Sequence, residues 1–192
     1  KQAFPEKTVL YISAEKFTQQ YIDSVKKNNR NDFIHFYQLI DVLIIDDVQF
    51  FSGKSGTQDV FFHIFNHLHQ NGKQVVLTSD KAPVDMQEIE QRLLSRFKWG
   101  LSAELQTPDY ETRISIIKNK LSRDGVLMDE EIIYYVAKHI KTNIRELEGA
   151  IISLMAQSSF NKKLITLDLA KVIVEKFVKN TKKEISIDQI QK

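Results

Sequence analysis

Two nearly continuous apolar runs, Asp41–Asp46 (DVLIID) and Gln74–Ser79 (QVVLTS), constrain the fold of this chain more than any other feature. Runs of this kind, without alternation, are typical of strands that are buried on both faces of a parallel sheet. Two further runs, Thr8–Ser13 and Trp99–Glu104, also have strand-like composition. Because segments with helical spacing lie between the strands, the sequence predicts a doubly wound α/β sheet with right-handed connections.

The strand pattern ends at Thr107-Pro108, and helical periodicity dominates the remainder of the chain. Asp109, Asp129 and Thr166 are suitable N-cap residues for helices, and Gly125 is a stop signal. We expect helices near 109–123, 129–139, 143–161 and 167–179.

The domain organisation depends on this change of pattern. We expect a partial α/β domain over residues 1–107 and a small all-α domain over residues 108–179. Residues 180–192 then begin with a polar linker, Asn180–Glu184, and Ser186-Ile187-Asp188 has the composition of the opening turn of a connector helix.

Composition excludes several classes of protein. The net charge of the 192 residues is only +2, so a nucleic-acid site would have to be a local patch. The absence of cysteine excludes disulfides, thiolate zinc sites and cysteine nucleophiles, and it fits a cytoplasmic location. No apolar run approaches the roughly 20 residues that span a bilayer. Lys1–Lys7 is not a signal peptide and lacks an initiator Met, so we expect the chain to begin inside a longer protein.

Two carboxylates, Asp46 and Asp47, end the buried strand of the first apolar run. Ligands of open α/β sheets bind beyond the carboxyl ends of the strands, and two acids there suit a Mg²⁺ ion beside a phosphate. Asp80 comes just after the next strand and would lie at the same edge. The pattern favours part of a P-loop-type ATPase, although a strand end that leads into a turn explains the pair equally well.

Three arginines extend this pattern. Arg92 and Arg96 are four residues apart, and so would share one face of a helix. An arginine exposed at a subunit boundary can stabilise charge on a phosphoryl group that a neighbour holds. Arg145 begins a helix of the second domain and could reach toward a nucleotide between the domains. The alternative for all three is an ordinary solvated helix face.

Five strings together carry a family resemblance: LIIDDVQFFSGK, FFHIFNHL, VVLTSDKAP, RLLSRFKWGL and NIRELEGAI. In this order and spacing the chain resembles the DnaA family of bacterial chromosomal replication initiators over essentially its whole length. The resemblance implies an AAA+ nucleotide-binding core and, after it, an α-helical lid. It implies these site residues: Asp46 and Asp47 in the Walker B motif, with Mg²⁺ at Asp46; Asp80 at sensor 1; Arg92 and Arg96 in box VII, with Arg96 as the arginine finger; and Arg145 at sensor 2.

The resemblance also implies a function for the full-length protein. Such proteins bind ATP or ADP with Mg²⁺, hydrolyse ATP weakly and use it mainly as a switch. They assemble as a helical oligomer on origin DNA, including single-stranded DNA, and help to open the duplex. The replicative helicase, regulatory proteins and acidic phospholipids are further partners that the resemblance implies.

An initiator-specific helical insertion would correspond to about Glu15–Leu39. The resemblance implies that Ile22, Lys54 and Thr57 line a channel for single-stranded DNA. A lysine can neutralise a phosphate and a threonine can donate a hydrogen bond to one. The chain departs from the family pattern at Gly56, where an arginine is frequent. Without the resemblance, the Gly and Ser content of residues 52–57 would indicate a solvated turn.

No G-x-x-x-x-G-K-[S/T] loop occurs in the chain. The resemblance places this loop upstream of Lys1 and a sequence-reading DNA-binding domain beyond Lys192. We therefore expect the 192 residues alone to hold no nucleotide tightly. Loss of the central strand that precedes the loop would leave Trp99–Glu104 poorly attached, unless dimerisation or rearrangement filled the slot.

Two alternative functions share many of these motifs. One is an initiator-related adaptor that binds proteins without ATP turnover, and the other is a helicase-loader ATPase. Retention of the acidic pair and the arginines favours the initiator over the adaptor. The ending Ser186–Lys192 favours the initiator over the loader, because the family continues there into its connector helix.

Overall fold

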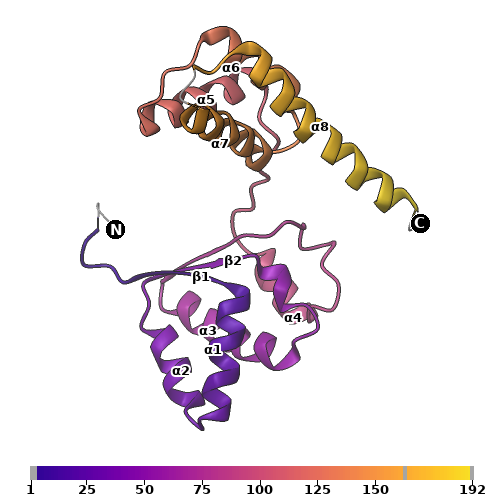
Figure 1. Ribbon diagram of the computed structural model, residues 1–192. Helices are drawn as coiled ribbons and strands as arrows, with labels where there is room; N and C mark the ends of the chain where they lie inside the picture. Colours follow the sequence, from indigo (N-terminus) through magenta and orange to yellow (C-terminus); the bar gives the residue numbers. More distant parts are fainter. Residues whose placement is uncertain (1–3, 162–163, 191–192) are drawn as a thin grey trace. The chain divides into compact units, whose positions relative to one another are not determined.

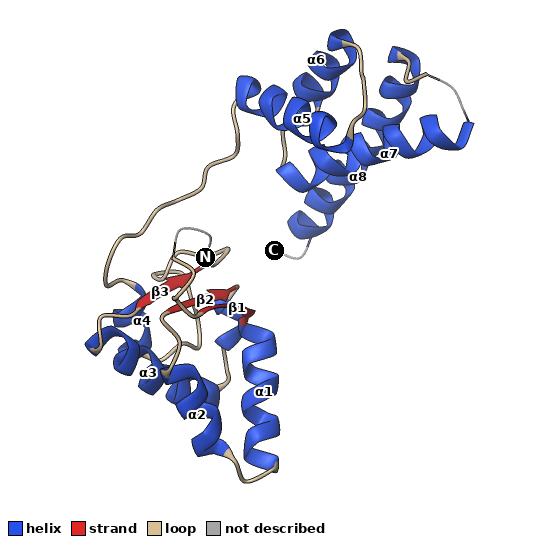
Figure 2. Ribbon diagram, turned by 90° about the vertical axis from the view of Figure 1, so that its left-hand side faces the viewer, coloured by secondary structure: helices blue, strands red, loops and turns tan. Residues whose placement is uncertain are grey.

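Three parallel strands form one sheet in the first half of the chain, in the order β1-β2-β3 (Figure 2). The structure, a computed structural model, describes residues 4–161 and 164–190. The strands are β1 (Val9–Ser13), β2 (Val42–Asp46) and β3 (Gln74–Leu77). Ser13 pairs with Asp46, so the carboxyl ends of β1 and β2 meet at one edge. These strands confirm three of the four predicted runs, within two residues at each end.

The helices of this first unit, residues Lys1–Ala103, gather on one face of the sheet (Figures 1 and 2). They are α1 (Ala14–Lys26), α2 (Arg30–Gln38), the 3-10 helix η1 (Val48–Phe51), α3 (Ser55–Gln70) and α4 (Gln91–Phe97). Aromatic side chains fill the space beneath the strands. The Phe17 ring makes edge contacts with Tyr37, Phe51 and Phe61 at centroid distances of 4.9, 5.7 and 5.6 Å.

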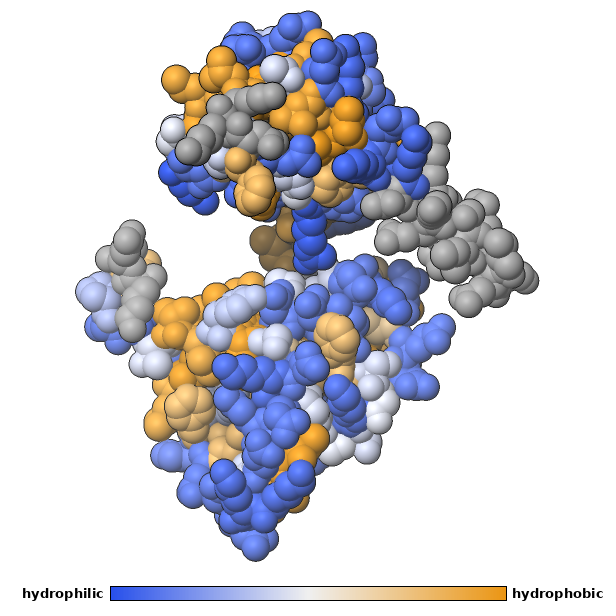
Figure 3. All heavy atoms as spheres, viewed as in Figure 1, coloured by the Kyte–Doolittle hydropathy of each residue, from blue (hydrophilic) through white to orange (hydrophobic). Residues whose placement is uncertain are grey.

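The opposite face of the sheet is exposed, which corrects the prediction of strands buried on both faces. Val76 in β3 is 41% exposed and Tyr11 in β1 is 64% exposed. Figure 3 shows hydrophobic residues at the surface on the side where β1 and β2 lie. The described helices cover one face only, so the sheet is not doubly wound within residues 4–161 and 164–190.

The prediction of a strand at Trp99–Glu104 is wrong. Among the described residues, this segment pairs with none of the three strands and runs as irregular coil after α4. Leu101 and Leu105 are 99% and 97% exposed, so these apolar side chains have no packing partner in either core. Beyond Trp99, whose ring lies 4.3 Å from that of His69, the segment is poorly attached, which is one of the two outcomes we expected for a sheet without its central strand.

In the second unit, Glu104–Lys192, the described residues form four helices around their own apolar core. They are α5 (Tyr110–Asp124), α6 (Glu130–His139), α7 (Ile144–Asn161) and α8 (Leu167–Ile190). The carboxylate of Asp109 caps α5 by accepting from Thr112 N at 2.8 Å, and Gly125 ends that helix with φ +67°. Thr166 Oγ1 accepts from Leu169 N at 3.3 Å, as predicted for a cap. Asp129 occupies the N-cap position of α6 without a side-chain bond.

The predicted linker, Asn180–Glu184, is helical and continues α8 to Ile190. Lysine and glutamate are good helix formers, and the segment contains neither Gly nor Pro, so nothing in it ends the helix. The predicted separate opening turn at Ser186 is therefore part of α8, and Gln191 and Lys192 lie outside the described residues. Across the described part of the chain, every helix is too short or too polar to cross a membrane.

A buried arginine, Arg113, ties the start of α5 to its surroundings. It is 8% exposed, and its Nε and Nη1 donate to the carbonyl oxygens of Ala137 and Pro108 at 2.7 and 2.8 Å. Hydrogen bonds from a charged group to buried carbonyls are stronger than neutral ones. The side chain thus fixes Pro108, where the second unit begins its first helix.

We expect Asp41→Asn to lower stability at neutral pH and to have little effect in acid. The Asp41 carboxylate accepts from Lys73 Nζ at 2.5 Å and from Thr8 N at 2.9 Å, and these bonds lower the pKa of Asp41. A carboxyl group whose pKa is lower in the folded than in the unfolded state stabilises the fold at a pH above its unfolded-state pKa. That stabilisation is lost as the pH falls through the folded-state pKa. Urea midpoints at pH 7 and about pH 3 measure this. The exposed control Asp85→Asn should shift neither midpoint, and an equal shift of the Asp41 variant at both pH values would contradict the assignment.

Candidate functional site

The Asp46 carboxylate is held at the edge of the sheet by two hydroxyl groups. The Tyr11 hydroxyl donates to Oδ2 and the Thr78 hydroxyl donates to Oδ1. Tyr11 comes from β1, Asp46 ends β2 and Thr78 lies directly after β3, so all three strands contribute to the group. The side chain that the sequence placed at a ligand-binding edge therefore has a fixed orientation, as a metal-shell ligand requires.

Asp47 has a left-handed backbone, with φ 58° and ψ 53°. Aspartate tolerates this region better than most residues. Its N–H donates to Thr78 Oγ1 at 3.0 Å, and its Oδ1 accepts from Gln49 Nε2 at 3.1 Å. The hydroxyl of Thr78 thus links the two acids, by donating to one and accepting from the backbone of the other.

Sequence reasoning missed Tyr11 as a site residue. Hydrogen bonding to Asp46 raises the pKa of Tyr11, and desolvation and the charges of Asp46 and Asp47 add to this. The phenol therefore stays protonated and remains a donor. Strand alternation could have identified it. Tyr11 pairs with Ile44, and Asp46 lies two residues further along β2, on the same face.

Asp80 lies in a bend after β3 and is exposed. The contact that the sequence led us to expect between this segment and Asp46 is made by Thr78 instead. Thr78 and not Asp80 makes this contact because β3 ends at Leu77, which leaves Thr78 in register with the end of β2. The Thr78 backbone N–H donates a hydrogen bond to Ile45 O at 3.0 Å. The assignment of Asp80 to sensor 1 stays a prediction.

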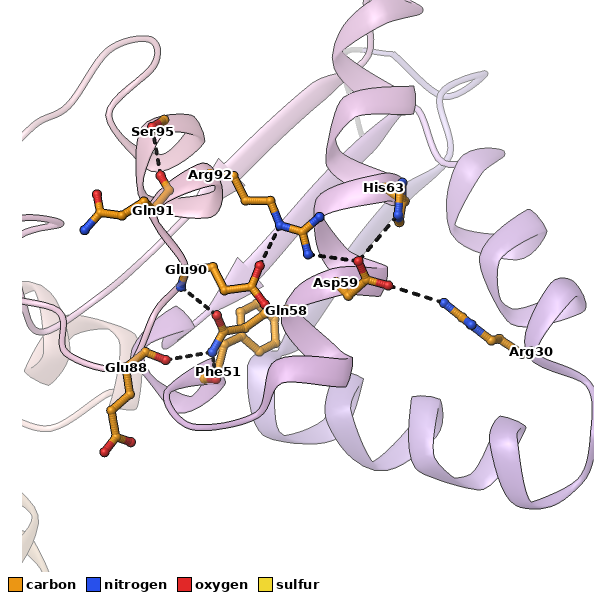
Figure 4. Close-up of polar contacts among 10 residues, drawn as sticks. All are labelled: Arg30, Phe51, Gln58, Asp59, His63, Glu88, Glu90, Gln91, Arg92 and Ser95. Atoms are coloured by element: carbon orange, nitrogen blue, oxygen red, sulfur yellow. Dashed lines mark hydrogen bonds and ion pairs between the residues drawn. The ribbon is translucent and has the colours of Figure 1, made fainter.

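The two α4 arginines lie on one face, as predicted. Their guanidinium carbons are 4.7 Å (Arg92) and 5.6 Å (Arg96) from the Phe62 ring centroid. Arg92 pairs with Asp59 at 2.9 Å and with Glu90 at 2.5 Å (Figure 4). The hydrogen bond to Glu90 raises the pKa of Arg92 most, and the hydrogen bond to Asp59 raises it further. Its charge is therefore compensated inside its own unit.

Arg96 has a different environment. Its Nε donates to the amide oxygen of Asn66 at 2.8 Å, and its guanidinium lies 5.0 Å from the centroid of the Trp99 ring. Within residues 4–161 and 164–190, no carboxylate forms an ion pair with it. A half-buried guanidinium that is oriented by neutral groups keeps its charge available for an anion. The geometry therefore suits Arg96, more than Arg92, for contact with a phosphate.

The residues predicted to contact DNA differ in their access to solvent. Ile22 is 39% exposed on α1, and Lys54 stands at the N-cap position of α3. Thr57 lies in the first turn of α3 and is only 4% exposed, so its side chain is not presented to a phosphate in solution. A Cβ at Gly56 would lie 3.7 Å from the Tyr21 ring, which is ordinary contact, so the backbone there accepts a Cβ without a clash.

Arg145 belongs to the second unit, where it is exposed in the first turn of α7. It borders an open hollow of about 590 Å³ that Pro108, Asn143 and Phe177 also line. Asn143 Oδ1 accepts from Glu146 N at 2.7 Å and so caps the helix that carries the arginine. The contact of Arg145 with a nucleotide stays a prediction.

The acidic pair fits a magnesium ion that shares its shell with phosphate and water. Mg²⁺ takes one or two carboxylates and keeps several waters. A carboxylate oxygen has two lone pairs, so the hydroxyl groups that donate to Asp46 do not prevent it from accepting from a metal-bound water as well. The amide oxygen of Gln49, next to Asp47, is buried and lacks a hydrogen-bond partner within the described ranges. The described residues contain no group of three His, Cys, Asp or Glu side chains, so an all-protein cage is not formed by them.

Comparison with known proteins gives consistent matches. The family described as "Bacterial DnaA ATPAse domain" matches residues 1–104. The chain is 83% identical over 192 residues to the chromosomal replication initiator protein DnaA of Flavobacterium psychrophilum, and 55% identical over 190 residues to that of Bacteroides fragilis. These alignments cover 100% and 99% of this chain. The chain spans 40% of the length of each of these relatives.

Solved structures agree with the sequence matches. Domain III of the Thermotoga maritima replication initiation protein DnaA superposes with a TM-score of 0.89 at 41% identity, over 93% of this chain and 75% of that one. A replication initiator DnaA bound to AMPPCP and single-stranded DNA gives 0.71 at 41% identity, over 77% and 46%. The three-stranded sheet and helices are those of the AAA+ fold of DnaA domain III. Matched over more than half of its length by the family description, this chain belongs to the family of bacterial DnaA ATPase domains.

Proposed function

We propose that the protein is a chromosomal replication initiator that binds ATP, assembles as a helical oligomer on origin DNA and helps to open the duplex. The observation that carries this proposal is the ordered acidic edge, Asp46 and Asp47 with Thr78, in a chain of the DnaA family. A relative with 41% identity is bound to AMPPCP and single-stranded DNA, which supports both ligands.

The site residues divide the work around the nucleotide. A bound Mg²⁺ would neutralise phosphate charge. Asp46 would hold its water shell, and Asp47 would polarise the water near the terminal phosphate. Asp80 and Arg145 would contact the nucleotide as sensors 1 and 2, and Arg96, with Arg92 beside it, would contact the nucleotide of an adjacent subunit. Hydrolysis on this proposal is weak, and ATP acts mainly as a switch.

The remaining partners belong to the same proposal. Ile22 and Lys54 would contact single-stranded DNA directly, and Thr57 would do so only if the first turn of α3 opened. The replicative helicase, regulatory proteins and acidic phospholipids are proposed partners of the full-length protein, and the cytoplasm is its proposed location. The 192 residues alone are proposed to bind ATP weakly or not at all, because the chain contains no glycine-rich phosphate loop.

Sedimentation of the full-length protein on origin DNA, with an ATP analogue and with ADP, tests the proposed function. We expect large assemblies with the analogue and few with ADP. Equal sedimentation in both states, with no nucleotide bound, would instead favour the adaptor alternative. A helicase-loader ATPase would bind nucleotide but show no preference for origin DNA over a scrambled duplex.

Lys54→Ala should weaken single-strand binding in a salt-dependent manner. Removing one phosphate contact reduces the slope of log K against log salt by about 0.7 for single strands. Gly56→Arg should increase the slope by a similar amount, because it adds a positive charge at a position where a Cβ makes only ordinary contact with Tyr21. Fluorescence anisotropy of labelled oligo-dT over a salt series measures both slopes. Parallel lines for wild type and both variants would remove this turn from the DNA site.

A further inference from the structure

The short helix α4 carries Arg92 and Arg96, and a segment without regular structure precedes it. Two leucines of α4 are buried in the first core, and the position at which the helix begins depends in addition on the preceding segment, Met86–Glu90. Met86 and Ile89 are 8% and 7% exposed and enter the first core. Apolar burial is non-directional, whereas hydrogen bonds favour one geometry and so can fix the orientation of this backbone.

One side chain of α3, Gln58, makes hydrogen bonds that orient the backbone of this segment. It is 2% exposed, and its amide makes three bonds of 2.8 Å. Nε2 donates to the carbonyl oxygens of Phe51 and Glu88, and Oε1 accepts from Glu90 N (Figure 4). A carboxylate could not donate to the two carbonyls, and an apolar side chain would remove all three bonds and leave Glu90 N without its acceptor.

The segment that Gln58 holds is strained. Glu88 has φ 56°, a left-handed value that is uncommon for a residue other than Gly, Asn or Asp. Such a conformation persists where surrounding contacts enforce it. Glu88 O also accepts from Gly53 N at 3.1 Å, and Gln87 O accepts from Ser52 Oγ at 2.5 Å. Gln58 is the one among these contacts that joins the segment to the interior of α3.

The same helix orients the arginines themselves. Asp59, the next residue, pairs with Arg92, and Asn66 accepts from Arg96 Nε. Phe62 lies beneath both guanidinium groups. Asp59 also contacts Arg30 at 3.6 Å and His63 at 3.5 Å, as Figure 4 shows. Asp59, Phe62 and Asn66 of α3 thus orient the guanidinium groups of the α4 arginines. Gln58 of the same helix instead orients the backbone that leads into α4.

We propose that Gln58 is a positioning residue for Arg96, which it holds in the orientation needed to contact the nucleotide of an adjacent subunit. This inference rests on the proposed function of Arg96. Gln58 touches no nucleotide in this role. It acts through the Met86–Glu90 backbone, so its loss should affect assembly and leave nucleotide binding within one subunit unchanged.

The test uses the full-length protein, with ATP-analogue affinity and analogue-dependent assembly on single-stranded DNA as readouts. Gln58→Ala should keep the affinity within about twofold of wild type, while the protein concentration for half-assembly rises about tenfold. The control Gln70→Ala changes an exposed glutamine of the same helix and should alter neither readout. Gln58→Met, which keeps the length of the side chain, carries the same expectation if the alanine variant does not fold.

Combination with Arg96→Ala separates positioning from general destabilisation. If Gln58 acts through Arg96, the double variant should assemble no worse than Arg96→Ala alone, within about twofold. Effects that multiply in the double variant, or wild-type assembly by both Gln58 variants, would overturn the inference while leaving the proposed function intact. Normal assembly by Arg96→Ala alone would overturn the proposed role of that arginine and this inference with it.

Discussion

Arg96→Ala in the full-length protein is expected to spare ATP binding and to weaken ATP-dependent assembly by about 30-fold or more. The guanidinium is oriented by Asn66 and by the rings of Phe62 and Trp99, and not by a carboxylate of the described chain. Its charge is therefore available to an anion on an adjacent subunit. Removing one partner of a desolvated charge pair across an interface costs about 2–5 kcal/mol. Analytical ultracentrifugation with an ATP analogue and calorimetric titration of the nucleotide measure the two effects.

Two variants make this test specific. Arg96→Lys keeps the charge but loses the planar fork, so assembly should recover only in part. Arg30→Ala removes an exposed arginine of the same unit, whose pair with Asp59 at 3.6 Å is a surface contact of little energy. It should assemble within about twofold of wild type. If Arg96→Ala assembles normally, or if Arg30→Ala fails as badly, Arg96 does not read the nucleotide of a neighbour.

Strand β2, which ends in Asp46, was the most predictable part of the molecule. The run that became β2 is apolar because Leu43 and Ile45 are fully buried, and it ends where Asp46 reaches solvent. Local composition decides both facts. Which faces of the sheet are covered was less predictable, because burial of Tyr11 and Val76 depends on the elements that pack over the strands and not on the strands themselves. An apolar strand indicates that both of its faces are suited to burial, but it does not indicate that the described residues bury both.

Side-chain partners at the site required the structure. The sequence placed Asp80 beside Asp46, since one follows a strand and the other ends one, but strand register brings Thr78 to that position. Nothing in the sequence indicated that Thr57 would be 4% exposed, because a Gly- and Ser-rich turn that leads directly into a helix has no pattern that separates its inner from its outer face. Gln58 was missed for a related reason. A single polar residue in an apolar helix can be recognised as a buried bridge only when its three backbone partners are known.

Separate cores in the two units should make a core substitution act on one unit alone, and Phe61→Ala should show this most strongly. Phe61 is fully buried and its ring lies 5.0, 5.6 and 6.4 Å from those of Phe51, Phe17 and Phe97. Truncation of a buried phenylalanine costs about 3–5 kcal/mol, a large part of the roughly 5–15 kcal/mol that holds a domain folded.

The expected result of Phe61→Ala is early unfolding of the sheet unit, with the helical unit unchanged. Fluorescence of Trp99, the single tryptophan of this chain, reports on the first unit in urea, and hydrogen exchange of peptides from α5 to α7 reports on the second. Leu154→Ala is the matched control, because Leu154 is fully buried in the other core and should reverse the pattern. Phe97 ends α4, so the same cavity should also loosen the helix that carries Arg96, and assembly should weaken before the unit unfolds. If peptides of both units lost protection together in either variant, the cores would be coupled and the two halves of the chain would form one cooperative domain.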